Sequence, residues 1–442
     1  MEAATRIPTP PVYRGAPRLQ GAVAPDYDNL MSCVKCGLCL SVCPTYATDT
    51  IEVQSPRGRV QLMRAVDEGE IPLTDTVVEH MYHCLDCRAC QTVCPSGVLV
   101  GEQVVLTRGA AEAARPAGWL KRLILQWLMV RPERLELAMW PARVYQWLGI
   151  QWLVRRTGVL KLLPEAVRSM ERLLPPLPAT PLRRALPEVT PAVGERRYRV
   201  GFFLGCVMSL VFAKTSARTV RVLAENGCEV VLPKALRCCG APHAGEGDFE
   251  TLRDLARHNV ALFSSHDLDY IVADCAACSA QTKEYAHLLR DDPAYSEAAA
   301  AFSAKMRDIT ELLAEIPLRQ PVEEVRALVT YHEACHLCHA QGITRQPREL
   351  LHSVPGVEVV EMRESTWCCG SAGVYNLTHP ERAQKILDRK LDNIAASGAE
   401  VVAAANPGCI LQLMAGIRER GLDVEVVHPV DLLAEGYGAG GR

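Results

Sequence analysis

The stretch that decides the fold reads CVKCGLCLSVCP over residues 33–44, and its pattern returns as CLDCRACQTVCP over residues 84–95. Both runs follow the spacing C-x2-C-x2-C-x3-C-P. In each run, three cysteines lie on one tight loop, and the fourth lies a helical turn further on and points away from the other three. Two such runs in one chain predict paired metal centres that share ligands between the runs.

This spacing is the one by which two-cluster ferredoxins hold a pair of [4Fe–4S] cubanes, each run giving its fourth cysteine to the other cluster. A zinc site is the alternative, but zinc takes four ligands, usually from two C-x2-C pairs. The sequence therefore predicts an electron carrier with two [4Fe–4S] clusters. The first cluster is assigned to Cys33, Cys36, Cys39 and Cys94, and the second to Cys84, Cys87, Cys90 and Cys43.

Length and composition limit the number of domains, the class of partner and the compartment that can be expected for this chain. With 442 residues it is too long for one core, and we expect two or three domains. A net charge of −3 gives no indication of a nucleic-acid partner. The chain has 19 cysteines, no signal-peptide pattern and no apolar run of about eighteen residues. We therefore expect a cytoplasmic protein, attached at most to the cytoplasmic face of the inner membrane.

Residues 116–161 carry five of the six tryptophans. An apolar face with helical spacing runs from Leu120 to Leu128, and its rim is mostly basic. Apolar face, tryptophans and cations together are typical of a helix that lies on a membrane surface. The alternative is packing against the rest of the protein or a partner subunit. The basic residues are Lys121, Arg122, Arg131, Arg134, Arg143, Arg155, Arg156 and Lys161.

From residue 196 onward, short apolar runs alternate with amphipathic helical patterns, which predicts an α/β domain with a mostly parallel sheet. Strands are expected over residues 198–204, 229–232, 270–273, 327–331, 357–361 and 401–405, and helices over residues 209–226 and 380–397. The fold class is thus α+β and multi-domain: a mainly helical two-cluster ferredoxin-like module followed by a duplicated α/β domain.

Six segments follow from these patterns. Proline-rich stretches mark the first and fourth, since proline at that density blocks helix and sheet. The segments are an extended arm (1–25), the ferredoxin-like module (26–115), the tryptophan-rich basic helices (116–170), a linker (171–196), and two α/β units (197–325 and 326–442).

A second set of cysteines is organised as a repeat, with one copy in each α/β unit. Each copy has a single cysteine, then Cys-Cys-Gly, then a last cysteine pair after a strand, and the second copy has lost the final cysteine of this pair. The carboxyl ends of strands are where open α/β sheets bind ligands, and adjacent thiolates predict an unusual metal centre. Glycine beside the pair lets the backbone approach closely. The copies are Cys206, Cys238, Cys239, Gly240, Cys275 and Cys278, and then Cys335, Cys368, Cys369, Gly370 and Cys409, with Gln412 in place of the final cysteine.

These units resemble the cysteine-rich domains of heterodisulfide reductase catalytic subunits, and the whole chain resembles iron–sulfur subunits of glycolate oxidase. The resemblance covers about residues 26–436. The stretches that carry it are YHCLDCRAC (82–90), CHLCHAQG (335–342), WCCGSAG (367–373) and NPGC (406–409).

The resemblance implies a non-cubane [4Fe–4S] cluster on the five cysteines of the first unit. With Gln412 at the fifth position, the second unit is left with three alternatives: a second non-cubane cluster, a cubane-like cluster, or none. It further implies FAD-bearing partner subunits that oxidise glycolate, and transfer of their electrons to membrane quinone. Since the chain has no dinucleotide fingerprint, the flavin site of this oxidoreductase is expected on other subunits.

Several residues near these sets have two interpretations. Cys338 forms C-x2-C with Cys335, but a buried free thiol is favoured for it and for Cys228. The histidines at 332, 336 and 339 are interpreted as structural, with proton donation to a reduced quinone as the alternative. Arg57 and Arg59 are either solvated or offset the charge of the clusters.

Two other functions remain open on the sequence. The complete first unit is compatible with a catalytic disulfide or thiol reductase. The same architecture also occurs in electron-transfer subunits whose flavoprotein partner oxidises lactate or glycerol 3-phosphate.

Overall fold

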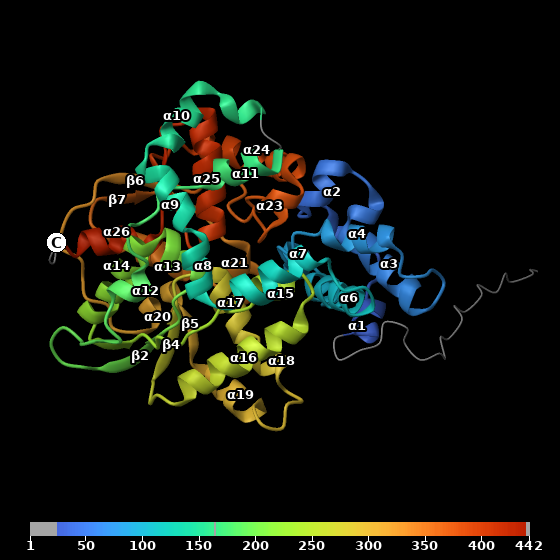
Figure 1. Ribbon diagram of the computed structural model, residues 1–442, viewed down its shortest axis with the longest axis horizontal. Helices are drawn as coiled ribbons and strands as arrows, with labels where there is room; N and C mark the ends of the chain where they lie inside the picture. Colours follow the sequence, from blue (N-terminus) through green and yellow to red (C-terminus); the bar gives the residue numbers. More distant parts are fainter. Residues whose placement is uncertain (1–23, 163–164, 439–442) are drawn as a thin grey trace, which may run out of the picture.

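Two β-sheets, one in each α/β unit, organise the computed structural model (Figure 1). The structure describes residues 24–162 and 165–438. The predicted arm over residues 1–25 therefore lies, apart from its last two residues, outside the described residues. In Figure 1 the N-terminal helical module, drawn in blue, lies beside the two sheet-containing units.

The first sheet has five strands in the order β1-β3-β2-β4-β5. Its central strand is β2, because Val200 pairs with Val230 on one side and with Tyr270 on the other. All neighbours are parallel except β1 and β3. The strands are β1 (Val189–Thr190), β2 (Tyr198–Phe202), β3 (Cys228–Val231), β4 (Tyr270–Ala273) and β5 (Met306–Asp308).

The second sheet is wholly parallel and has the order β7-β6-β8-β9. Its strand β8 is buried along its whole length, as expected for a parallel strand covered by helices on both faces. The strands are β6 (Ala327–His332), β7 (Val357–Val359), β8 (Val401–Ala404) and β9 (Glu425–Val427).

Both sheets place the first strand of their unit between the second and the third, with the fourth outside the third. This shared order is the structural counterpart of the cysteine repeat, and it confirms the predicted fold class with its duplicated, mostly parallel α/β domain. In each sheet, this order brings the carboxyl ends of two neighbouring strands together, β2 with β4 and β6 with β8. The first and the last cysteines of each copy of the repeat follow these strand ends.

The predicted strands agree with the structure to within two residues at each end, and the range 270–273 coincides with β4. Strands β1, β5 and β9 were not predicted; each is only two or three residues long. The predicted helix over residues 380–397 coincides with α24, whereas the one over residues 209–226 is two helices that meet at Phe212.

Helices cover both sheets and supply most of the buried side chains between them. Those of the first unit are α13 (Cys206–Val211), α14 (Ala213–Glu225), α15 (Ala241–Gly245), α16 (Phe249–Ser264), α17 (Ala276–Lys283), α18 (Tyr285–Leu288), α19 (Ser296–Lys305) and α20 (Ile309–Glu315). Those of the second unit are α21 (Cys335–Gln341), α22 (Arg345–His352), α23 (Tyr375–Thr378), α24 (Pro380–Ser397), α25 (Pro407–Arg420) and α26 (Pro429–Gly436).

The N-terminal module is helical, and its core of Leu30, Val60, Met63, Met81 and Val104 packs against four of the cysteines. It has no strand among its described residues. Its elements are α1 (Tyr27–Met31), η1 (Leu38–Leu40), α2 (Pro44–Asp49), η2 (Glu52–Gln54), α3 (Pro56–Asp67), α4 (Asp75–Tyr82), α5 (Ala89–Thr92) and α6 (Val100–Ala114).

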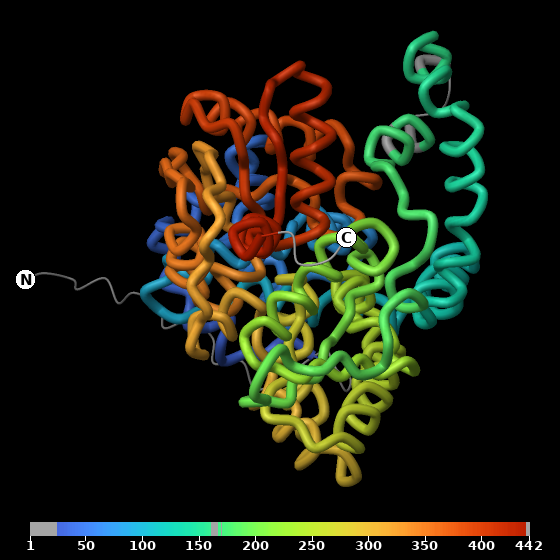
Figure 2. The backbone as a smooth tube through the Cα atoms, turned by 90° about the vertical axis from the view of Figure 1, so that its left-hand side faces the viewer, coloured from blue at the N-terminus to red at the C-terminus, as the bar shows by residue number. Residues whose placement is uncertain are grey.

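The tryptophan-rich segment is helical as predicted, and it runs along the outside of the molecule in teal and green (Figure 2). Most of the predicted apolar face stays exposed, because Leu120 is 55% exposed and Trp127 is 49% exposed, although Leu125 between them is buried. Its elements are α7 (Trp119–Arg122), the π-helical η3 (Leu123–Met129), α8 (Pro132–Ala138), α9 (Trp140–Trp147), α10 (Ile150–Thr157), η4 (Val159–Leu162) and α11 (Glu165–Leu173).

The prediction that residues 171–196 hold no helix or strand is wrong. Helix α12 (Leu182–Ala185) lies within this range, and β1 adds an antiparallel edge to the first sheet. Proline occurs only outside these two short elements or just before α12, so its fixed φ does not oppose them.

Among the described residues, none of the helices combines the length and the hydrophobicity needed to cross a bilayer.

Candidate metal centres

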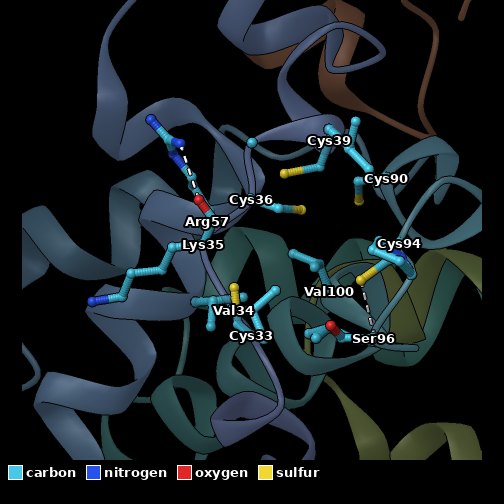
Figure 3. Close-up of a pocket in the computed structure, with 15 residues that line it drawn as sticks. Cys33, Val34, Lys35, Cys36, Cys39, Arg57, Cys90, Cys94, Ser96 and Val100 are labelled. Atoms are coloured by element: carbon cyan, nitrogen blue, oxygen red, sulfur yellow. Dashed lines mark hydrogen bonds between the residues drawn. The ribbon is translucent and has the colours of Figure 1, made fainter.

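The first cysteine set of the N-terminal module surrounds a hollow near the surface (Figure 3). The sulfurs of Cys33, Cys36, Cys39 and Cys94 are directed toward this common space from two separate loops. Cys36 is exposed, so one corner of the site reaches the surface. The structure thus brings together the four residues assigned to the first cluster.

Left-handed backbone shapes both cysteine loops in the same way. Lys35 and Gly37 have φ of 57° and 85° in the first loop, and Asp86 and Arg88 have φ of 47° and 60° at the matching positions of the second. Non-glycine residues adopt this region at some cost, which indicates that the loop geometry is held by its surroundings.

The second set gathers around Cys90. Burial, followed by the neighbouring thiols of Cys84 and Cys43, raises the pKa of Cys90 well above its ordinary value. Thr45 Oγ1 lies 3.3 Å from Cys43 Sγ, and the backbone N–H of Asp86 donates to Cys84 Sγ at 3.4 Å. A cationic metal centre would stabilise the thiolate form of cysteines in such a buried site.

Arg57 and Arg59 have different surroundings. The guanidinium of Arg59 is buried and donates to the backbone oxygen of Gln54 and to Thr45 Oγ1, the hydroxyl beside Cys43. Arg57 forms a partly exposed ion pair with Glu52 and lines the hollow of the first set. One arginine is therefore structural, and the other can offset charge at the site.

The second set is next to the second α/β unit. Burial, followed by the neighbouring thiols of Cys368 and Cys335, raises the pKa of Cys87 well above its ordinary value. Leu85, beside it, packs in one apolar cluster with Trp367 and Cys368. The N-terminal module is therefore docked with its second cysteine set against the second Cys-Cys-Gly site.

Polar contacts hold this docking in place. Arg88 donates to Glu284 at 2.6 Å, and Thr92 Oγ1 lies 2.9 Å from His339 Nδ1. Arg382 pairs with Asp49 at 3.0 Å. These contacts span from the cysteine loops of the module to both α/β units, so the relative position of the cysteine sets is well defined.

The five cysteines of the first unit form a continuous row of thiol contacts. The row runs from Cys206 to Cys238, Cys239, Cys278 and Cys275. Four of the five are buried, and hydrogen bonds from its two neighbours in the row lower the pKa of Cys239. No disulfide joins any cysteine of the described chain. Five converging and mostly buried thiols in reduced form fit a metal centre better than a packed apolar core.

The second unit has a matching but shorter row, from Cys335 through Cys368 and Cys369 to Cys409. Gln412 stands where the first unit has Cys278, and its Oε1 accepts a hydrogen bond from Asn376 Nδ2 at 2.9 Å. The structure therefore brings together the four predicted cysteines of this unit.

Gly240 and Gly370 act alike in the two rows. The N–H of Gly240 donates to Cys238 Sγ, and that of Gly370 donates to Cys368 Sγ, each at 3.4 Å. Both glycines have φ near 85°, and a Cβ on Gly240 would lie 2.3 Å from Leu252 Cδ1. This geometry fits the predicted role of both glycines, which is to let the backbone lie close to the adjacent cysteine pair.

Two of the three histidines near Cys335 approach the row: His336 Nδ1 lies 3.5 Å from Cys335 Sγ at its start, and His332 lies beside the sulfurs at its other end. The ring of His332 lies with Cys369 and Cys409 in a group whose ligand atoms are all within 4.8 Å of one another. Burial, and then the charge of Lys390, lowers the pKa of His332 well below its ordinary value, so its ring is neutral. A comparison of the two repeats could have singled it out, because Phe203 is its counterpart three residues before Cys206.

The remaining cysteines are buried, as expected for free thiols. Cys338 Sγ lies 3.9 Å from the backbone oxygen of Cys335, and Cys228 Sγ lies 3.9 Å from that of Asn226. Neither belongs to a row of thiols.

Three family models match the chain, and together they cover most of it. One described as a 4Fe-4S dicluster domain matches residues 29–98, and one described as a cysteine-rich domain matches residues 200–283 and 329–414. A third, described as the linker region of the glycolate oxidase iron-sulfur subunit, matches residues 116–174. The first two indicate iron–sulfur clusters at the cysteine sets described above.

Curated relatives extend over the same length. The chain is 39% identical to the probable glycolate oxidase iron-sulfur subunit of Bacillus subtilis, covering 93% of this chain and 95% of that protein. It is 32% identical to the glycolate oxidase iron-sulfur subunit of Escherichia coli, covering 88% and 91%. A fumarate reductase (CoM/CoB) subunit from Methanothermobacter marburgensis is 28% identical, covering 96% and 76%.

A solved structure, a hypothetical protein from Helicobacter pylori, has the same general fold. Its TM-score is 0.52 at 9% sequence identity, over 91% of this chain and 72% of that one. At this identity the likeness concerns the fold alone.

Proposed function

Because the chain belongs to the glycolate oxidase iron–sulfur subunit family, we propose that it carries electrons from FAD-bearing partner subunits that oxidise glycolate toward membrane quinone. The chain is then the electron-transfer subunit of an oxidoreductase complex, and the substrate is oxidised elsewhere. We further propose that the protein works on the cytoplasmic face of the inner membrane.

The observation that carries this proposal is the position of Cys87. Its thiol belongs to the second cysteine set and lies within electrostatic reach of Cys335 and Cys368 in the second unit. Together with the exposed Cys36 at the other end, this position supports a path from the surface through both sets of the module to the second unit. Electron transfer across a protein needs a series of redox sites, whereas a purely structural metal protein does not.

The residues of this chain have distinct roles in the proposal. The thiolates of the four sets would hold iron–sulfur clusters, which supply one-electron transfer when bound. Cys36 exposes one corner of the first set to a partner. The burial of Cys238 and Cys239 excludes water from the inner sets, and Arg59 fixes the backbone around Cys43 through Thr45.

The exposed apolar face of residues 119–153 supports a peripheral docking role. Trp119, Trp147 and Trp152 are more than half exposed, although large apolar side chains are usually buried. Several cations of the rim are engaged within the chain, since Lys121 pairs with Glu246 and Arg155 with Glu171. The apolar surface therefore contributes more to docking than the charge does, and it fits a membrane surface or a partner subunit.

Low-temperature EPR on the complex, purified without oxygen, tests the function. Glycolate, D-lactate and glycerol 3-phosphate are added in turn. Reduced-cluster signals that rise with glycolate alone support the proposal, and signals that rise only with another substrate change the donor. If none of the three reduces the clusters, the electron-transfer role is lost.

A thiol or disulfide reductase is the second candidate, and the complete row of five cysteines in the first unit favours it. Such an activity would show as a change in the EPR signal of this unit when a dithiol or a disulfide is added, with no response to hydroxyacids. The incomplete second unit, with Gln412 at the last position, argues for electron transfer instead.

A further inference from the structure

The two copies of the repeat differ at the position that completes the row of sulfurs. In the first unit Cys278 contacts both Cys239 and Cys275. The counterparts of those two partners in the second unit are Cys369 and Cys409, but Gln412 replaces the cysteine between them. A centre built on the same plan therefore lacks one protein ligand in the second unit.

His332 lies beside the same two sulfurs. Its ligand atom and those of Cys369 and Cys409 are mutually within 4.8 Å. It reaches them from the end of β6, whereas Cys278 reaches its partners from α17. We propose that His332 supplies a nitrogen ligand to the metal centre of the second Cys-Cys-Gly unit, in the place that Cys278 takes in the first.

The surroundings of His332 agree with a ligand and not with a packed side chain. The residue is 1% exposed, and neither ring nitrogen has a hydrogen-bond partner among the described residues. A buried imidazole without any partner destabilises the fold, because its polar atoms lose water and gain nothing. In the first unit, Phe203 stands at the matching position and stacks on Phe263, so the position itself requires no polar group.

A second pair of matching positions changes together with the first. Gly205 precedes Cys206, and a Cβ on Gly205 would lie 3.2 Å from Cys278 Sγ. The matching residue of the second unit is Ala334, which has that Cβ, and no sulfur needs the space. Three differences between the repeats therefore belong to one exchange: glycine to alanine, cysteine to glutamine, and phenylalanine to histidine.

The other neighbours of this site are less suitable as the missing ligand. The Oε1 of Gln412 already accepts from Asn376, and Cys338 is not part of the group formed by His332, Cys369 and Cys409. A neutral imidazole in place of a thiolate also makes the centre less negative, as in Rieske clusters, where histidine ligands raise the reduction potential. We expect the second centre to have a higher potential than it would have with five cysteines.

The inference rests on the proposed function only in that the second unit holds an iron–sulfur centre. Its test is pulsed EPR of the complex, purified without oxygen from cells grown with 15N-labelled histidine or with ordinary histidine, over a redox titration. All other predicted ligands are cysteines, so a directly bound nitrogen can come only from this centre. A strong nitrogen coupling that changes with the isotope supports the proposal, and its absence at every potential overturns it.

Variants separate His332 from other histidines. His332→Cys should keep the iron content, remove the nitrogen coupling and lower the midpoint potential of this centre. His332→Ala should remove the coupling together with iron. His352→Ala, an exposed histidine of the same unit, should change neither. A coupling that survives in His332→Cys would overturn the assignment. Reduction by glycolate is recorded separately, so that loss of the donor and loss of the ligand are distinguished.

Discussion

The Oδ1 of Asn406, in the second Cys-Cys-Gly unit, lies 3.7 Å from the Sγ of Cys275 in the first unit. The same oxygen accepts a hydrogen bond from the backbone N–H of Ala277 at 3.2 Å, and the Nδ2 of this side chain lies 3.5 Å from Cys409 Sγ. One amide therefore contacts a cysteine of each row. It places the two centres next to each other across the interface between the units.

Replacing Asn406 should change both centres. In Asn406→Ala, Cys409 loses a hydrogen-bond donor, and because such bonds raise cluster potentials, the midpoint potential of the second centre should fall. Loss of the bond to Ala277 should destabilise the protein by ~1 kcal/mol. Redox titration followed by EPR measures the first effect and thermal unfolding the second. Asn393→Ala, on the distant part of α24, is the control, and an unchanged potential in Asn406→Ala would contradict the assigned role.

Cys87 should be essential for transfer between the module and the α/β units. Cys87→Ser is expected to lose iron from the second cluster and to block quinone reduction, while glycolate still reduces the flavin of the partner. Iron analysis and separate assays of flavin and quinone reduction check this. Cys228→Ala removes a buried thiol outside all four cysteine sets and should leave transfer intact. Normal quinone reduction in Cys87→Ser would show that electrons bypass this site.

Much of the fold could be predicted because local patterns determine it. The apolar run over residues 270–273 is buried on both faces, and the amphipathic pattern over residues 380–397 is long and uninterrupted, so both coincide with the structure. Strand β1 lies in a proline-rich stretch and exists only because its two residues pair with β3. Pairing of this kind depends on the tertiary fold and leaves no periodic signal in so short an element.

The cysteine sets could be predicted as well, since their spacing reflects ligand geometry. The role proposed for His332 and the contacts of Asn406 could not be predicted from this spacing, because each depends on contacts between elements far apart in the chain. His332 was interpreted as structural, although the register of the repeats aligns it with Phe203. The exposure of Trp119 also required the structure, since an apolar helix face in a sequence is more often buried.

The exposed tryptophans should matter for docking and not for folding. A double variant, Trp119→Ser with Trp147→Ser, should keep its thermal stability to within about 0.5 kcal/mol, because both side chains are largely exposed. Binding to vesicles that contain phosphatidylglycerol should weaken about tenfold for each inserted side chain, at ~1.5 kcal/mol each. Val322→Ser, a change at another exposed apolar residue, is the control. Unchanged vesicle binding with a lost flavoprotein subunit would assign the face to that partner.

His428 should make the second unit sensitive to acid. Burial lowers the pKa of this imidazole to about 4, whereas in the unfolded chain it is about 6.5. Between these values the unfolded state binds the extra proton, so stability is complete above pH 6.5 and falls as the pH drops toward 4, by about 3 kcal/mol in all. Melting temperatures at pH 7.5, 6 and 5 measure the loss.

In the matched variant His428→Asn, the side chain can still accept from the N–H of Val430 and cap α26, while the titrating group is gone. Its melting temperature should therefore depend less on pH than that of the wild type. An equal pH dependence in both proteins would assign the acid sensitivity to other groups.

A residue without a side chain should be required before the first cysteine of the row only in the first unit, at Gly205. In Gly205→Ala, the new Cβ would lie 3.2 Å from Cys278 Sγ, closer than an ordinary carbon–sulfur contact, so this sulfur must shift slightly from its place in the row. We expect the EPR signal of the first centre to be lost or shifted, with the other signals unchanged. The mirror variant Ala334→Gly removes a Cβ where no fifth sulfur stands, and it should leave the second centre spectroscopically intact. If Gly205→Ala kept a normal first-centre signal, Cys278 could not be the ligand that this glycine accommodates.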